Sequence, residues 1–90
     1  MSTVLSAETA VSPEDLERVT ALIGRLANLT DLGPTDDIYD AGFSSIKALE
    51  LLLELETEFD VTIEDDQFIA ARTPVALATM TAQLREEQGG

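Results

Sequence analysis

The sequence predicts an all-α fold, a small bundle of three main helices with a minor fourth. Three segments repeat apolar residues at helical spacing, and two of them begin with a hydroxyl residue followed by proline, a common helix start. One short alternating stretch would be a strand without a partner. Ninety residues suffice for one compact domain. We expect it to occupy residues 12–87, between flexible segments at 1–11 and 88–90.

The first helix is predicted to begin after Ser12 and to end near Asn28. Ser12 is a suitable N-cap, Pro13 fits the first helical position, and two acids follow where the helix dipole favours negative charge. Its apolar face consists of Leu16, Val19, Leu22, Ile23 and Leu26.

Residues 29–43 are predicted to form a long loop between the first and second helices, because glycine, proline and aspartate recur there. Ordered loops of this length are often functional. Ile38, Tyr39 and Phe43 are the apolar residues of the loop, and we expect them to anchor it to the core.

The second helix is predicted over Ser45 to Phe59. At 100° per residue, an apolar arc should face the core, made of Ile46, Leu49, Leu52, Leu53 and Phe59. Charged residues should lie opposite, namely Lys47, Glu50, Glu54 and Glu58. Leu51 falls near the boundary of the arc, where exposure is expected.

The remaining chain is predicted to form an extended strap, a helical turn and a last helix. Residues 59–63 alternate apolar and polar side chains, which suits a strap over the helices. Residues 65–70 should form a short turn with Phe68 and Ile69 pointing inward. Thr73-Pro74 then begins a helix that ends near Glu87. Its core face is predicted to be Val75, Leu77, Ala78, Met80, Thr81 and Leu84.

Composition restricts the function. Acidic residues number 18 and basic residues 5, for a net charge of −13, so nucleic acid and anionic membranes are poor partners and a basic protein surface is a good one. The chain has no cysteine and no histidine, which argues against an autonomous enzyme and removes the soft metal ligands. The acids Asp36, Asp37 and Asp40 lack the spacing of a calcium loop, so no metal site is predicted. No secretion signal or long apolar run occurs, and we expect a cytoplasmic protein.

Two serines precede the second helix and differ in their expected roles. Ser44 is the better N-cap, with its oxygen occupied by backbone N–H groups, which leaves the Ser45 hydroxyl on the first turn free. A phosphate on Ser45 would meet unpaired N–H groups and the positive end of the helix dipole. Considered alone, however, two serines at a helix start are most often only caps.

Over roughly residues 14–86 the chain resembles the acyl and peptidyl carrier proteins. The segment from Ala41 to Ile46 is similar to the family's Gly-hydrophobic-Asp-Ser-Leu signature. Other stretches with similar residues at matching spacing are Glu50-Leu51 with Leu55-Glu56, Glu58 to Ile63 with Asp65, and Thr73-Pro74-Val75. The resemblance implies a helical bundle of acyl-carrier-protein type with a long first loop.

By position, Ser45 matches the serine that receives 4'-phosphopantetheine from coenzyme A, and Ser44 matches the aspartate before it. The resemblance implies that a phosphopantetheinyl transferase supplies magnesium and the activating chemistry. The thiol of the arm would then hold acyl groups as thioesters. Catalysis would belong to the partner enzymes.

The resemblance also implies that the outward side of the second helix docks on basic patches of partners. The matching positions are Ser44, Lys47, Glu50, Leu51, Leu53 and Glu56. Serine at 44 and lysine at 47 depart from the family pattern, in which acids are frequent at both places. We hypothesise that Lys47 offsets the added phosphate or selects a partner with an acid. The alternative for any one glutamate is a merely solvated helix side.

The predicted function is a stand-alone, monomeric carrier in polyketide or nonribosomal natural-product assembly. The sequence of residues 39–45 resembles the corresponding sequence of discrete carriers of aminoacyl or specialised-metabolite units. Expected partners are the phosphopantetheinyl transferase, an acyl- or aminoacyl-loading ligase, and an acyltransferase or synthase with a basic docking patch. The alternatives are a fatty-acid-type acyl carrier protein and, from another class, an unmodified acidic helical adaptor for a basic protein.

Overall fold

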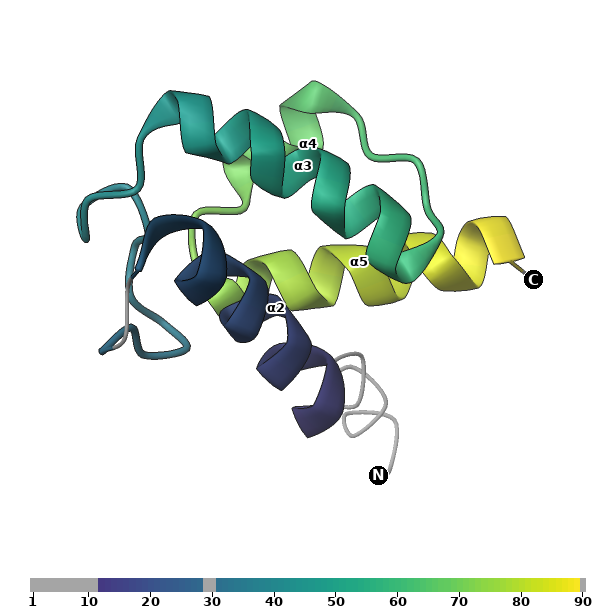
Figure 1. Cartoon of the computed structure of the whole chain (residues 1–90). Coiled ribbons are helices and arrows are strands. Elements are labelled where there is room, and N and C mark those ends of the chain that lie inside the picture. The colour runs from purple at the N-terminus through teal and green to yellow at the C-terminus, as the bar shows by residue number, and fades with distance from the viewer. Residues whose placement is uncertain (1–11, 29–30, 90) are drawn as a thin grey trace.

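A computed structural model describes residues 12–28 and 31–89 of the chain. It contains helices α2 (Pro13–Ala27), α3 (Ser45–Phe59), α4 (Asp65–Ala70) and α5 (Pro74–Gly89), and no strand occurs in the described ranges (Figure 1). The predicted all-α fold is confirmed. Residues 1–11 and residue 90, which we expected to be flexible, lie outside the described part.

The predicted capping residues set the helix boundaries. The Asp15 N–H donates to Ser12 Oγ at 3.0 Å, and Pro13 occupies the start of α2. Asn28 ends the helix in the left-handed conformation, with its N–H donating to the Gly24 carbonyl at 2.7 Å. At the start of α5, the Ala76 N–H donates to Thr73 Oγ1 at 3.1 Å.

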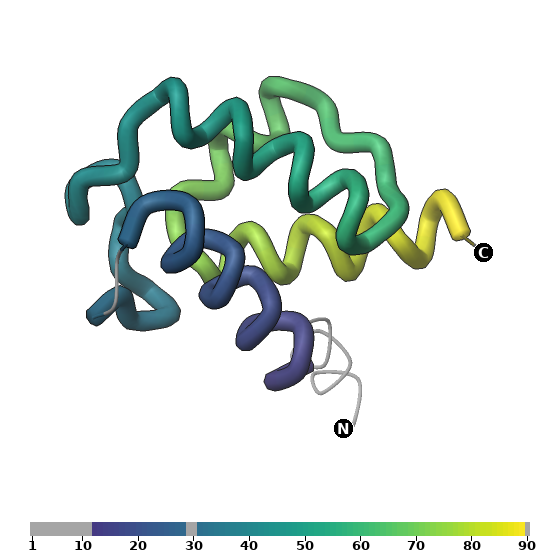
Figure 2. The backbone as a smooth tube through the Cα atoms, in the orientation of Figure 1, coloured from purple at the N-terminus to yellow at the C-terminus, as the bar shows by residue number. Residues whose placement is uncertain are grey.

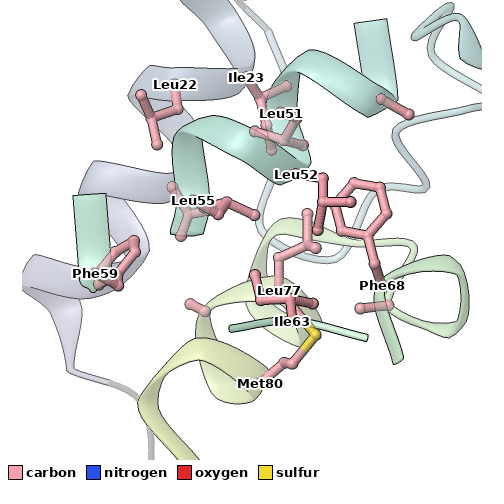
Figure 3. Close-up of a cluster of buried hydrophobic side chains, with 14 of the residues drawn as sticks. Leu22, Ile23, Leu51, Leu52, Leu55, Phe59, Ile63, Phe68, Leu77 and Met80 are labelled. Atoms are coloured by element: carbon pink, nitrogen blue, oxygen red, sulfur yellow. The ribbon is translucent and has the colours of Figure 1, made fainter. Parts of the chain in front are cut away.

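The core lies where α2, α3 and α5 meet, and Figure 3 shows its leucines, isoleucines and phenylalanines interlocking. The predicted face of α2 is confirmed, since Val19, Leu22 and Ile23 are buried and the two flanking leucines pack partly against the core. On α5, all the predicted core residues except the half-buried Val75 are buried. Helix α3 supplies a buried row made of Ala48, Leu51, Leu52, Leu55 and Phe59.

The predicted face of α3 was wrong in three positions, although its ends were correct. Ile46, Leu49 and Leu53 are 75%, 61% and 58% exposed, whereas Leu51, expected near the boundary, is completely buried. The error has a physical cause. Leucine and isoleucine occupy more of the circumference of α3 than one buried face can hold, so periodicity alone does not select the face that packs on α2 and α5.

The loop from residue 31 to 43 is held against the start of α5, as expected from its apolar residues. Ile38 and Phe43 are buried and Tyr39 packs partly against the core. The Ile38 N–H donates to the Arg72 carbonyl at 2.9 Å, and the Val75 N–H donates to the Pro34 carbonyl at 3.0 Å. The loop and the α4–α5 connection are therefore joined through backbone hydrogen bonds.

Residues 60–64 form the predicted strap, which turns back from the end of α3 to reach α4 (Figure 2). Val61 and Ile63 are buried, as their alternation predicted.

Helix α4 buries Phe68, but Ile69 is 61% exposed, because consecutive helical residues point about 100° apart and only one side of this short helix meets the core. The inward position predicted for Ile69 was wrong.

Helix α5 continues to Gly89, beyond the predicted end at Glu87. These two added residues are stabilised by the side chain of Gln88, whose Nε2 donates to the Thr62 carbonyl at 3.0 Å and whose Oε1 accepts from the Thr62 N–H at 2.8 Å. Gln88 and Gly89, which we expected to belong to a flexible tail, are thus part of α5. Among the described helices, none combines the length and apolarity that crossing a membrane requires.

Two arginines flank the buried ring of Phe59 at the far end of α3. The guanidinium carbons of Arg18 and Arg85 lie 4.8 Å and 5.5 Å from the ring centroid. Arg85 forms an ion pair of 2.8 Å with the nearly buried Asp15, and Arg18 forms one of 2.6 Å with Glu58. These contacts join α2, α3 and α5.

Candidate functional site

The two serines at the start of α3 occupy the different positions that the sequence predicted. Ser44 is the N-cap, because its Oγ accepts a hydrogen bond from the Lys47 N–H at 3.2 Å. Ser45 is the first helical residue and is exposed. Its hydroxyl therefore lies at the solvent-facing, positive end of the α3 dipole.

The turn before the serines needs a glycine and a fixed loop. Gly42 has a φ of 112°, a conformation in which a side chain is strained. Its N–H donates to the Tyr39 carbonyl at 3.1 Å. Asp37 Oδ1 accepts the N–H groups of Tyr39 and Asp40 at 2.8 Å and 3.1 Å. These bonds fix the loop that leads into α3.

Ser45 borders an open groove of about 390 Å³ between α3 and α4. Most of the groove wall is apolar, and the lining residues are Tyr39, Ser45, Ala48, Leu49, Leu52, Asp65, Phe68, Ile69 and Arg72. A group attached to the Ser45 oxygen would start at the edge of this groove.

Arg72 is held at the groove by the loop. Its Nε donates to Asp37 Oδ2 at 2.6 Å and its Nη2 to Asp37 Oδ1 at 3.3 Å, and its guanidinium carbon lies 4.7 Å from the centroid of the Tyr39 ring. The hydrogen bond from Arg72 lowers the pKa of the Asp37 carboxyl, and burial raises the pKa of the Tyr39 hydroxyl.

Five of the six predicted partner-recognition residues lie at least partly on the surface. Ser44, Glu50 and Leu53 are exposed, and Lys47 is half-buried, with its Nζ 3.6 Å from Glu50 Oε1. Glu56 is also half-buried, and its Oε2 accepts the Ile63 N–H at 2.9 Å.

Leu51 is a correction to that set. Its side chain has no exposed surface and lies in the core with Leu55, so it cannot contact a partner. The family spacing placed it on the outward side, but the packing of α3 on α2 and α5 turns it inward.

Apart from Leu53, which the resemblance placed on the outward side of the second helix, sequence reasoning missed an exposed apolar surface, which we call the open face. It consists of Ile46, Leu49 and Leu53 on α3 and Ile69 on α4, each more than half exposed. A signal for it was present, because α3 carries more leucine and isoleucine than one buried face can hold. Arg72 was also missed, since only the folding of the loop onto the α4–α5 connection brings it to the groove that Ser45 borders.

Comparison with known proteins assigns this architecture to a family. A family model described as "Phosphopantetheine attachment site" matches residues 17–81. The chain is 32% identical over 76 residues to the hybrid PKS-NRPS synthetase pynA of Aspergillus niger, an alignment that covers 80% of this chain and 2% of that protein. The chain therefore spans only a small part of this relative's length.

A solved structure has a similar fold. It is the solution structure of a non-covalent extended docking domain complex of the Pax NRPS, PaxA T1-CDD/PaxB NDD, with a TM-score of 0.78 and 20% sequence identity over 89% of this chain and 77% of that chain. At this identity the likeness shows the fold alone.

The residues at the start of α3 fit the cofactor of the matched family. The cofactor needs a hydroxyl that an enzyme can reach, and Ser45 is exposed beside an open groove. Its phosphate needs neighbouring hydrogen-bond donors, which the first turn of a helix supplies. The chain belongs to the phosphopantetheine-binding carrier proteins, whose cofactor is a covalently attached 4'-phosphopantetheine.

Proposed function

We propose that the protein is a carrier of the polyketide or nonribosomal-peptide type that holds acyl or aminoacyl intermediates as thioesters, and that Ser45 is its attachment residue. One observation supports this most strongly: the Ser44 oxygen is engaged as the cap, while Ser45 is exposed on the first turn. The relative's name, a hybrid PKS-NRPS synthetase, supports the pathway type.

In the proposed attachment reaction, the Ser45 oxygen forms a bond to the phosphorus that carries the pantetheine in coenzyme A. The bond between that phosphorus and the bridging oxygen breaks, and the nucleotide portion leaves with the electron pair. The serine proton goes to a base on the transferase, because this chain has neither histidine nor cysteine. We therefore propose a non-catalytic role for the chain itself.

The first turn of α3 would stabilise the product. Its backbone N–H groups and the helix dipole favour an anion near Ser45, each such charge–dipole contact being worth about 0.3–1 kcal/mol at an exposed site. The 4'-phosphopantetheine, when bound, supplies the thiol that carries the cargo. After attachment, Ser45 would hold the arm in place and take no part in the chemistry of the cargo.

We propose that partner enzymes dock on the open face and on the charged residues beside it. A solvent-exposed cluster of large apolar side chains is unfavourable unless another surface covers it. The net charge of −13 favours a partner with basic residues around an apolar patch. Expected partners are the transferase, a loading ligase, and an acyltransferase or synthase.

The attachment is tested by incubating the folded protein with coenzyme A, Mg²⁺ and a broad-range phosphopantetheinyl transferase, then measuring intact mass. Wild type and Ser44→Ala should gain the mass of one phosphopantetheinyl group, and Ser45→Ala should gain none. Ser44→Ala is the matched control because it removes the neighbouring hydroxyl. A folded wild-type chain without mass gain would instead support the acidic adaptor.

A further inference from the structure

Attachment of the proposed arm creates an electrostatic problem at Ser45. A phosphodiester would add one negative charge to a chain whose net charge is already −13. Asp65 is one of the residues that line the groove that Ser45 borders, and Asp40 is exposed in the loop just before the serines. Charges of the same sign on neighbouring parts of the surface disfavour each other. A cation near Ser45 would offset this repulsion.

Among the described residues, Arg72 is the one basic residue that lines this groove. Its guanidinium is fixed by Asp37 and by the ring of Tyr39, so little side-chain entropy would be lost on binding an anion. Among the described residues, the hydrogen bonds that the Arg72 guanidinium donates come from Nε and Nη2. The Nη1 donors remain available, and arginine has five N–H donors in all.

The other basic residues are less suitably placed. Lys47 lies two residues after Ser45, about 200° around the helix, and contacts Glu50 on that side. Arg25 pairs with Glu54, which is about 13 Å along α3 from Ser45 at 1.5 Å per residue. Arg18 and Arg85 flank Phe59 at the opposite end of α3. Arg72 is therefore better placed than Lys47 to offset the negative charge of the phosphate.

We propose that Arg72 is a positioning residue that holds the phosphodiester on Ser45 against the groove between α3 and α4. This inference rests on the proposed attachment at Ser45. Asp37 and Tyr39 act through Arg72 by fixing its guanidinium. The arm would accordingly leave Ser45 over the groove instead of directly into solvent.

The test compares apo and holo forms, so that the structural role of the Arg72–Asp37 pair cancels. Holo protein is prepared from wild type, Arg72→Gln and Arg72→Lys, and complete modification is verified by mass. In wild type, modification should leave the melting temperature unchanged or raise it. In Arg72→Gln, the holo form should melt lower than the apo form by about 2–5 °C. Arg72→Lys should give an intermediate result.

Arg25→Gln is the matched control, since it removes the same charge from an exposed arginine whose pair is longer, at 3.5 Å. Its apo–holo difference should equal that of wild type. In the wild-type protein, the ¹⁵Nε–H signal of Arg72 should also move on modification more than the signals of Arg18, Arg25 and Arg85. This readout does not depend on any variant folding.

The outcomes separate the two proposals. Absence of mass gain would remove the attachment at Ser45 and, with it, this inference. A fully modified protein whose Arg72 signal does not move more than the other arginine signals would overturn the role of Arg72 alone. Equal apo–holo differences in wild type and folded Arg72→Gln would overturn it as well.

Discussion

The two sides of α3 are both rich in leucine, yet one is closed and the other open. The side toward α2 and α5 buries Leu51 and Leu55 completely. On the exposed side, Leu49 and Leu53 are 61% and 58% exposed, and Leu49 also lines the groove that Ser45 borders. The same residue type therefore stabilises the fold on one side and leaves surface for contacts on the other.

The charged contacts differ in the same way. Near Phe59, Arg85 pairs with an aspartate that is only 9% exposed, and this pair joins helices distant in sequence. Arg72, by contrast, is half exposed, pairs with a loop aspartate, and lines the groove that the candidate attachment residue borders. The first arrangement closes the bundle, whereas the second places a cation where a ligand could reach it.

Matched leucine substitutions should produce the largest difference between the two sides of α3. Leu55→Ala should lower the free energy of unfolding by about 2–5 kcal/mol, because it opens a cavity in the core. Leu49→Ala should change it by no more than about 0.5 kcal/mol. Urea unfolding measures both values. Equal losses in the two variants would contradict the assignment of buried and open sides.

A charge on the open face should affect docking more than folding. Leu49→Asp should lower the kcat/KM of the transferase about tenfold, because an exposed apolar contact in the proposed interface is lost. Ala21→Asp places the same charge at an exposed position of α2 and should change kcat/KM less than about twofold. Equal kinetics for the two variants would remove the proposed docking role of this face.

The smallest expected effect is a pH dependence at the loop. The pKa of Asp37 is lowered in the folded protein by the hydrogen bond from Arg72, so its contribution to stability is present above the ordinary value of 3.8 and is lost as pH falls below it. Asp37→Asn and Arg72→Gln should both show a shallower loss of stability than wild type below about pH 4. Unfolding curves between pH 2 and pH 5 measure this, and parallel curves for all three proteins would contradict it.

The sequence was sufficient to predict features that depend on neighbouring residues. Ser12-Pro13, Ser44 and Thr73-Pro74 marked helix starts because an N-cap acts within a few residues. The cap at Ser44 also separates the roles of the two serines, because only one of them can hold the N-cap position.

Features that depend on packing could not be predicted in this way. Periodicity misplaced Leu51 and Ile69, because α3 is apolar on several sides and α4 is only six residues long. Arg72 lies 27 positions after Ser45, and no local pattern indicates that the loop brings it to the groove. These errors fall mainly on the α3–α4 side, where the structure buries less.

Fragmentation mass spectrometry of the modified wild-type protein tests attachment at Ser45 directly, because it identifies the residue that carries the added group. We predict that fragment ions place one phosphopantetheinyl group on Ser45 and leave Ser44 unmodified. Placement of the group on Ser44, or on any residue outside the start of α3, would contradict the account.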